Sequence, residues 1–467
     1  MPSADRVAPV FLRCDSGPDL EKADLSQVRT VGIINVTPDS FSDGRLYESP
    51  EAAINHGLAL LRDGADELDV GGESSRPGAA SVSVAEECAR VVPPVAGLRA
   101  AGVAAPISID TFHAKTARAA LEAGVDGVND VTGFRDPQMR ECAAASGARC
   151  VVMRPGAVTP DSCGGRGEDD EPAGTFNLEA TVEFLLAQAW LLERAGVARE
   201  RIALDPGFGF TATRDDDIRL FGQAPQLIAR LRDEGYAAYV GLSRKRFVTT
   251  LFGERPLAER DQATAELSAA LAAAGATYLR VHDAATMRAE LNRLATQPPQ
   301  VAYVALGSNV GDCEAQLRAA LGFLQALPAT TLDAIAPLYI SEPAYYDDQP
   351  PFYNTVARLR TRLGPRALFA ELQAWERLAG REKLLPNGPR NIDLDLLSYG
   401  DGIIETEALT LPHPRIAQRA FVVEPLLALD PDYRFPTGTC LTREAEAYGA
   451  IIEVRPPLLP DVAPASL

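Results

Sequence analysis

The sequence predicts an α/β protein in which a (β/α)8 TIM barrel is followed by a ferredoxin-like α+β domain. Short apolar runs alternate with helical patterns eight times in the first half of the chain, which is typical of such a barrel. The second half shows the order strand, helix, two strands, helix and strand, which is typical of a ferredoxin-like domain. A chain of 467 residues is also too long for one core, because cores stop growing at roughly 250–300 residues.

The eight runs of the first half are apolar or rich in β-branched residues, and segments rich in Ala, Leu and Glu follow most of them. The runs are Val31–Val36, Glu67–Val70, Ile107–Ile109, Gly127–Val128, Cys150–Met153, Ile202–Leu204, Ala238–Val240 and Tyr278–Val281. A doubly wound open sheet is the structural alternative, because it also alternates strand and helix.

The second pattern begins after ATQPPQ at residues 295–300, a Pro-containing segment typical of a linker. Its segments are Val301–Leu306, Glu314–Leu327, Leu332–Ile340, Tyr353–Arg360, Ala367–Leu378 and Ile392–Tyr399. We therefore expect an N-terminal extension at residues 1–29, the barrel at 30–295, a linker at 296–300 and the second domain at 301–467.

Composition and charge exclude several classes of function. The formal net charge of −19 excludes a general nucleic-acid surface, because binding a phosphate backbone requires Lys and Arg gathered on one face. No run approaches the roughly 18 apolar residues of a membrane span, and the first residues lack the apolar core of a signal peptide. The seven cysteines are widely spaced without a CxxC pair, so we expect reduced thiols in a cytoplasmic protein.

Polar residues stand where the predicted strands of the first half end. In a (β/α)8 barrel these ends surround the active site, so the side chains are expected to face one another. Asp and Asn are also common helix caps, but caps alone do not explain so many polar residues at equivalent positions. The residues are Asn35, Asp69, Asp110, Asn129, Asp205, Lys245 and His282.

The chemistry of these side chains suits a flat base that carries a diphosphate. The carboxylates of Asp110 and Asp205, the amide of Asn129 and the ammonium of Lys245 match the edge of an amino-pyrimidinone. A second group consists of Asn35, Arg76, Arg280 and His282 and offers cationic and neutral donors for a diphosphate. The amide oxygen of Asn35 could hold a metal ion.

Two carboxylates in the second half could bind divalent cations. Asp393 and Asp395 stand two residues apart in NIDLDLL, so on a strand both point to one face. The alternative is a half-buried strand with a solvated acidic face. No GxxxxGK[ST] segment exists, so phosphate binding would depend on metal ions and arginines. Nearby candidates for phosphate donors and an aromatic wall are Arg390, His413, Arg419 and Phe421.

Five motifs of the first half resemble dihydropteroate synthase in that family's order, over roughly residues 30–295. They are GIINVTPDSFSDG at 32–44, DVGGESSRPGA at 69–79, LDPGFGF at 204–210, GLSRKRF at 241–247 and LRVHD at 279–283. The resemblance implies a barrel that joins 6-hydroxymethyl-7,8-dihydropterin diphosphate to p-aminobenzoate and releases diphosphate.

The same resemblance implies roles for individual residues. The pterin would be held by Asp110, Asn129, Met153, Asp205 and Lys245. The diphosphate would be held by Mg2+ together with Asn35, Arg76, Arg280 and His282. The p-aminobenzoate would lie against Phe41, Ser75, Pro77 and Phe210. Catalysis would depend chiefly on Lys245, Arg280 and His282.

Four motifs of the second half resemble 6-hydroxymethyl-7,8-dihydropterin pyrophosphokinase, over about residues 301–440. They are VALGSNVGD at 304–312, DQPPFYN at 348–354, GPRNIDLDLL at 388–397 and LPHPR at 411–415, which RAF follows at 419–421. The resemblance implies transfer of diphosphate from ATP to the hydroxymethyl group of the pterin, leaving AMP.

This second resemblance also implies site residues. Mg2+ would be bound by Asp393 and Asp395, which with Arg390 would carry the catalysis. The pterin would lie between Phe352 and Phe421, with its edge read by Ser341 and Asn354. The residues around ATP would be Glu376, Arg381, Arg390, His413 and Arg419.

We therefore expect a bifunctional folate-biosynthesis enzyme whose second domain makes the substrate of the first. The segment EKLLPNG at 382–388 lacks the Arg-Trp pair that many pyrophosphokinases carry on a mobile catalytic loop. A second hypothesis accordingly makes the C-terminal half a pterin-binding or scaffolding module with weak or no kinase activity. A third places the barrel among pterin-dependent methyl carriers. The sequence leaves a homo-oligomer, the domain orientation and any channelling open.

Overall fold

The computed structural model describes residues 12–13, 25–37, 49–74, 81–156, 176–346, 348–381, 388–443 and 448–459. The chain divides into two compact units. One consists of Asp24–Thr250 and Glu254–Ala295, and the other consists of Met1–Ala23, Leu251–Gly253 and Thr296–Leu467. Among the helices of these described stretches, none combines the length and the apolar character that crossing a membrane requires.

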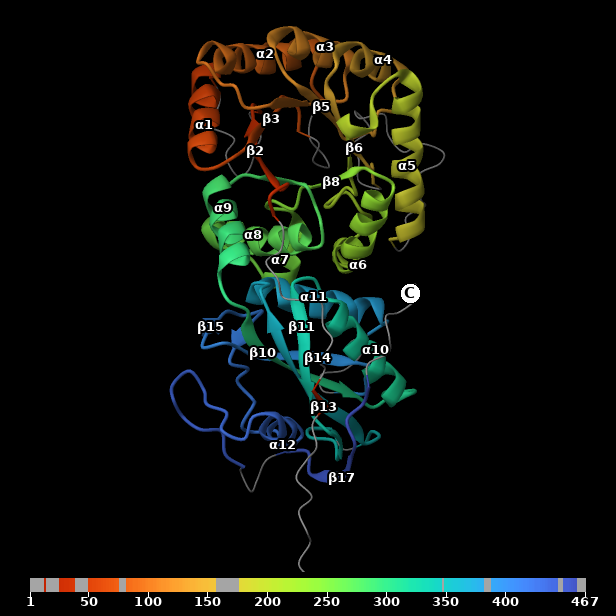
Figure 1. The fold of residues 1–467 in the computed structure, drawn as a ribbon, viewed down its shortest axis with the longest axis vertical. Coiled ribbons are helices and arrows are strands. Elements are labelled where there is room, and N and C mark those ends of the chain that lie inside the picture. Colours follow the sequence, from red (N-terminus) through yellow and green to blue (C-terminus); the bar gives the residue numbers. More distant parts are fainter. Residues whose placement is uncertain are drawn as a thin grey trace, which may run out of the picture. The chain divides into compact units, whose positions relative to one another are not determined.

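The barrel unit contains a closed ring of parallel strands (Figure 1), as the sequence predicts. Its strands pair in sequence order, and β2 closes the ring by pairing with β9 from Arg29 and Tyr278 to Gly32 and Val281. The strands are β2 (Arg29–Asn35), β3 (Glu67–Gly71), β4 (Ile107–Asp110), β5 (Gly127–Asp130), β6 (Arg149–Met153), β7 (Ile202–Asp205), β8 (Ala237–Val240) and β9 (Tyr278–Val281).

Helices between the strands cover the outside of this barrel (Figure 1). Local sequence sets their ends: Thr213 and Asp216 form a capping box at the start of α6, and Gly124 ends α3 in the left-handed conformation, with φ 110°. The helices are α1 (Pro50–Arg62), α2 (Val84–Ala100), α3 (Ala114–Ala123), α4 (Pro137–Ser146), α5 (Leu178–Ala195), α6 (Arg214–Asp233), α7 (Arg246–Phe252), α8 (Leu257–Ala273) and α9 (Ala284–Thr296).

The interior of the barrel changes from apolar to polar along the strands. Val31, Val151, Ala203 and Tyr239 form one buried apolar cluster from four strands. Residues two positions apart on a strand share a face, so Asp205 projects to the same side of β7 as Ala203 but nearer the C-terminal end. The apolar cluster therefore forms a floor beneath the polar strand ends.

The second unit has an antiparallel sheet in the order β11-β13-β10-β14, which is the strand order of a ferredoxin-like domain. Side chains of β10 alternate between two cores. Val304 and Leu306 pack in the core that contains α10 and α11, whereas Tyr303 packs in the core that contains α12. The elements are β10 (Gln300–Ser308), α10 (Cys313–Ala326), β11 (Thr330–Ile335), β13 (Phe352–Thr361), α11 (Pro365–Leu378), β14 (Asp393–Tyr399) and α12 (Ala420–Leu429).

Three features of this unit differ from the sequence-based expectation. The predicted strand Leu332–Ile340 is two strands, β11 and β12 (Leu338–Ser341), since Pro337 between them has no N–H to donate. Short strands near both chain ends also join the sheet: β1 (Leu12–Arg13) pairs with β11, and β17 (Ile451–Arg455) pairs with β12. A small hairpin comprises β15 (Ile404–Glu405) and β16 (Thr410–Leu411).

Candidate active sites

Charged and amide side chains from four strands meet at the C-terminal end of the barrel. Arg280 on β9 donates from Nε to Asp69 Oδ2 at 2.6 Å and from Nη2 to Asp110 Oδ2 at 2.9 Å. Asn129 on β5 donates from Nδ2 to the same oxygen of Asp69 at 3.2 Å. One guanidinium thus compensates two neighbouring carboxylates, of which Asp69 is fully buried.

Burial moves the pKa values of the ionisable groups at this end of the barrel. It raises the pKa of Asp110 to about 7, although Arg280 opposes the shift. It raises the pKa of Asp205 to about 6, against the hydrogen bond that Asp205 Oδ1 accepts from the Gly207 N–H at 2.8 Å. The pKa of Lys245 falls to about 8, through burial and then through the charge of Arg280. These groups therefore titrate close to neutral pH.

An apolar wall lies beside these charges. The Nζ atom of Lys245 lies 4.5 Å from the centroid of the Phe210 ring. Phe210 packs in turn against Val131 and Met153 in one buried cluster. A wall of this kind next to donors and acceptors suits a flat ring with a polar edge.

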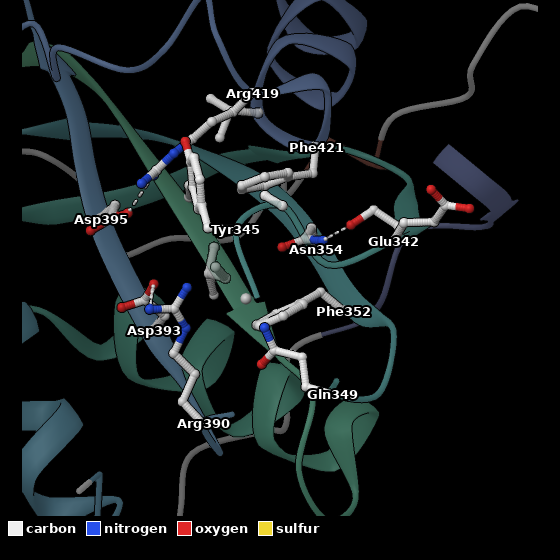
Figure 2. Close-up of a pocket in the computed structure, with 16 residues that line it drawn as sticks. Glu342, Tyr345, Gln349, Phe352, Asn354, Arg390, Asp393, Asp395, Arg419 and Phe421 are labelled. Carbon is white, nitrogen blue, oxygen red and sulfur yellow. Dashed lines mark hydrogen bonds and ion pairs between the residues drawn. The ribbon is translucent and has the colours of Figure 1, made fainter. Parts of the chain in front are cut away.

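A pocket in the second unit is formed by β10, β12, β13, β14 and the start of α12 (Figure 2). The aromatic side chains of Phe352 and Phe421 both line it, and in Figure 2 Asn354 lies between them. Asn354 Nδ2 donates a hydrogen bond to Ser341 Oγ at 3.0 Å. The pocket thus offers two aromatic faces and a polar edge, as a flat heterocycle requires.

Carboxylates and arginines lie at the other side of this pocket (Figure 2). Asp393 and Asp395 lie on one face of β14, and burial followed by the charge of Asp395 raises the pKa of Asp393. Asp393 pairs with Arg381 at 2.5 Å and with Arg390 at 3.1 Å, and Asp395 pairs with Arg419 at 3.2 Å. Two adjacent carboxylates of this kind fit a divalent cation, and the arginines fit phosphate oxygens.

Three predicted ATP residues, Glu376, Arg381 and His413, contact this strand without lining the described pocket. Glu376 Oε1 accepts the Leu394 N–H at 2.7 Å and pairs with Arg381, and burial followed by the charge of Asp393 raises its pKa to about 7. Burial also lowers the pKa of the His413 imidazole. The backbone N–H of His413 donates to a carbonyl of β14 at 2.7 Å.

Comparison with known proteins assigns both halves. The model of pterin-binding enzymes matches residues 31–282, which is more than half of the chain. The chain belongs to the pterin-binding enzyme family. A second model, that of 7,8-dihydro-6-hydroxymethylpterin-pyrophosphokinase, matches residues 303–431 of this pterin-binding enzyme. The two matches confirm the prediction of a bifunctional transferase of folate biosynthesis.

Individual relatives support the barrel assignment. A dihydropteroate synthase of Streptococcus pyogenes serotype M3 is 40% identical over 255 residues, which are 54% of this chain and 89% of the relative. The structure of Xanthomonas albilineans dihydropteroate synthase with 4-aminobenzoic acid has 37% identity and a TM-score of 0.50, covering 57% of this chain and 92% of that one. The structure of a Yersinia pestis dihydropteroate synthase in a sulfonamide drug complex has 31% identity and a TM-score of 0.50, covering 60% of this chain and 96% of that one.

The structure brings together many of the residues that the resemblance selects. In the pterin-binding barrel these are Asp110, Asn129, Met153, Asp205, Phe210, Lys245 and Arg280, while Asn35 ends β2 and His282 follows β9. The predicted residues Phe41, Ser75, Arg76 and Pro77 lie outside the described residues. In the pyrophosphokinase domain the pocket is lined by Ser341, Phe352, Asn354, Arg390, Asp393, Asp395, Arg419 and Phe421.

Sequence reasoning left some supporting contacts undetected. It placed Asp69 among the polar residues at the strand ends but did not predict the hydrogen bonds that Asp69 accepts from Arg280 and Asn129. It also missed Ser243, whose Oγ lies 2.8 Å from His282 Nδ1. Ser243 belongs to the GLSRKRF motif, which was the sequence signal that could have found it. No sequence signal indicates the partners of Asp69, because these residues meet only when the barrel closes.

A C-terminal segment also shapes the pyrophosphokinase pocket. The Ala420 N–H donates to Tyr448 O at 2.9 Å, and the Glu342 N–H donates to Ala450 O at 2.9 Å. The segment therefore connects the stretch that carries Glu342 to the stretch that carries Phe421, and both residues line the pocket. Between these two bonds lies Gly449, with φ 75° and no room for a Cβ, which would lie 2.5 Å from the ring of Phe421.

We predict that Arg280→Ala lowers the free energy of unfolding by about 3 kcal/mol at pH 8, because Asp69 and Asp110 lose their shared cation in a buried place. The loss should be smaller at pH 5.5, because this pH lies below the raised pKa of about 7 of Asp110 and protonation neutralises that carboxylate. Urea unfolding at both pH values measures it. The matched control is Arg230→Ala, which removes a solvent-exposed pair with Glu179 and should cost far less. Equal losses for both variants would contradict the assigned role.

We predict that Gly449→Ala raises the KM of the pyrophosphokinase for its pterin by roughly tenfold, because the new methyl group displaces the Phe421 ring. Steady-state assays over a range of pterin concentrations measure this. Gly438→Ala is the control, since Gly438 has φ 85° but open space around its Cβ position. A KM increase of the same size in both variants would contradict displacement of the Phe421 ring, because Gly438→Ala strains the backbone without touching that ring.

Proposed function

We propose that the pyrophosphokinase domain transfers diphosphate from ATP to 6-hydroxymethyl-7,8-dihydropterin, and that the barrel then joins this product to p-aminobenzoate. The products of the second step are 7,8-dihydropteroate and diphosphate. The supporting observation is that each domain places a wall for a flat ring beside a polar edge and a charged region suited to phosphates. The described cysteines are free thiols, which supports our expectation of a cytoplasmic enzyme.

In the barrel, Asp205 and Asn129 would accept hydrogen bonds from the N–H groups of the pterin, and Lys245 would donate to its ring carbonyl. The amine of p-aminobenzoate attacks the methylene carbon, and the C–O bond to the diphosphate breaks. Arg280, held in place by Asp69, brings a fixed positive charge to the end of the barrel where this anion would leave. His282 would add a hydrogen-bond donor.

Mg2+ is the divalent cation that we propose for both steps. In the pyrophosphokinase domain Asp393 and Asp395 would hold it, because they present oxygens on one face of β14. In the barrel the amide oxygen of Asn35 would contribute. When bound, the cation supplies neutralisation of charge on the phosphate oxygens.

In the pyrophosphokinase domain, the rings of Phe352 and Phe421 would hold the pterin between them. The hydroxymethyl oxygen would attack the β-phosphorus of ATP in line with the leaving AMP. Arg390 and Arg419 already lie beside Asp393 and Asp395, so their donors are near the place where the phosphates would bind. This step depends chiefly on positioning and charge.

The barrel reaction should have a bell-shaped pH profile of kcat/KM between about pH 6 and pH 8. Asp110 and Asp205 must be ionised to accept, and their raised pKa values of about 7 and about 6 set the acid limb. Lys245 must be protonated to donate, and its lowered pKa of about 8 sets the alkaline limb. Lys245→Arg should keep the acid limb and shift the alkaline limb to higher pH, since Arg stays charged. An unchanged alkaline limb would refute the role of Lys245.

Replacing Asp395 by Asn should lower AMP formation from ATP and the hydroxymethylpterin by at least roughly 10²-fold, because one ligand for the cation loses its charge. Asp401→Asn, at an exposed position just after β14, should leave the rate unchanged. Chromatographic detection of AMP without p-aminobenzoate isolates this step. Absence of AMP even from the unmodified chain would favour a C-terminal module that only binds the pterin.

A further inference from the structure

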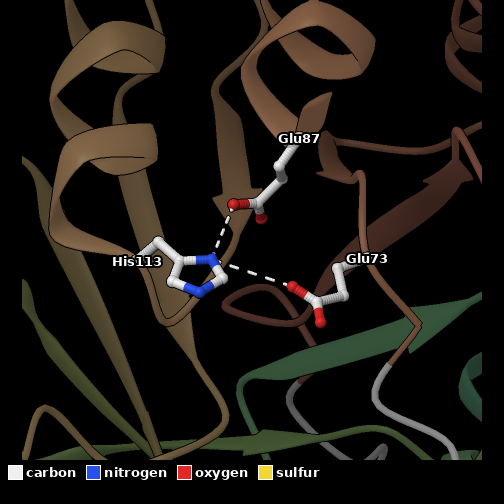
Figure 3. A group of neighbouring side chains, drawn as sticks. All are labelled: Glu73, Glu87 and His113. Atoms are coloured by element: carbon white, nitrogen blue, oxygen red, sulfur yellow. Dashed lines mark hydrogen bonds and ion pairs between the residues drawn. The ribbon is translucent and has the colours of Figure 1, made fainter. Parts of the chain in front are cut away.

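A cluster of three titratable side chains has no role in either proposed reaction (Figure 3). Glu73 follows β3, Glu87 lies on α2, and His113 precedes α3. His113 Nδ1 lies 2.9 Å from Glu87 Oε2 and 3.7 Å from Glu73 Oε2. The side chain of Glu87 is 0% exposed and that of Glu73 is 3% exposed, whereas the imidazole is 26% exposed.

Hydrogen bonds within the protein leave two oxygens of this cluster without partners. Glu87 Oε2 accepts from Thr116 Oγ1 at 2.6 Å, and Glu73 Oε1 accepts the Val82 N–H at 3.2 Å. Glu73 Oε2 and Glu87 Oε1 are buried and accept no hydrogen bond. Glu73 Oε2 is the oxygen that points at the imidazole (Figure 3). One imidazolium can neutralise only one of the two buried carboxylates, and Arg90, whose charge also acts on Glu73, already pairs with Glu86, so the cluster is short of positive charge.

We propose that Glu73, Glu87 and His113 form a binding site for a divalent transition cation of the Zn2+ class. Tetrahedral coordination with bonds of roughly 2.0–2.1 Å places ligand atoms about 3.3 Å apart. The separations of 2.9 and 3.7 Å from His113 Nδ1 lie on either side of that value. All three ligand atoms lie within 4.8 Å of one another. Small shifts of the side chains would bring both separations from His113 to that value, and a water molecule would complete the coordination.

The ligand types and their surroundings fit this cation. An imidazole nitrogen with two carboxylates favours Zn2+ over Mg2+, which prefers oxygen ligands. Thr116 and Val82 hold the carboxylates through hydrogen bonds, as the outer contacts of metal ligands do. The dication would replace the proton on His113 and balance both carboxylates. The partly exposed imidazole provides a route of entry.

Zinc uptake by the full chain tests the proposal. The protein is stripped of metal, supplied with excess Mg2+ to occupy the oxygen-only sites, and titrated with ZnCl2 in a calorimeter. The unmodified chain should bind one equivalent of Zn2+, and its X-ray absorption spectrum should show an imidazole ligand. Glu73→Gln, which keeps the size of the side chain, should weaken binding at least tenfold. His113→Ala should remove the imidazole signal.

The matched control is His56→Ala, which removes a histidine of α1 that contacts Ile33 O and lies outside the cluster. It should bind zinc like the unmodified chain. Circular dichroism shows that each variant is folded before it is titrated. The proposal is overturned if the unmodified chain takes up no zinc in excess Mg2+, or if Glu73→Gln and His113→Ala bind zinc as tightly as His56→Ala does.

Discussion

Compensation of buried carboxylates by arginine is the constraint on which both sites depend. In the barrel, parallel strands end together and bring Asp69 and Asp110 close to each other above an apolar floor. Two negative charges in such a place are unfavourable unless a cation lies between them. Arg280 provides that cation through one fork, with contacts of 2.6 and 2.9 Å. The same arrangement leaves Lys245 and Asp205 titrating near neutrality, which suits a site that must bind a polar ring and release an anion.

The pyrophosphokinase domain meets the same constraint with three arginines in place of one. Asp393 and Asp395 pair with Arg381, Arg390 and Arg419. Binding of a divalent cation to the carboxylates would release these guanidinium groups towards phosphate oxygens, so cation and nucleotide would support each other. The aromatic half of the pocket has a different origin. It depends on backbone bonds from the C-terminal segment, which holds the stretches that carry Glu342 and Phe421.

The sequence was sufficient for the strands of the barrel, because each is a short apolar run between helical patterns. It was also sufficient for Asp393 and Asp395, since period-two spacing places them on one face. It did not reveal the pairing of Arg280 with Asp69, which depends on closure of the ring between distant strands. The division at Pro337 was readable from the proline itself. The pairing of β1 and β17 with the sheet was not, because short edge strands carry little pattern.

In the proposed function, one chain carries two consecutive reactions at separate sites. A coupled assay from the hydroxymethylpterin, ATP and p-aminobenzoate to dihydropteroate tests it most directly, with the variants Asp395→Asn and Lys245→Ala. Each variant alone should form almost no dihydropteroate, and an equal mixture should restore it, because the diphosphate made at one intact site can diffuse to the other. Full activity of either variant alone, or no recovery in the mixture, would contradict the account.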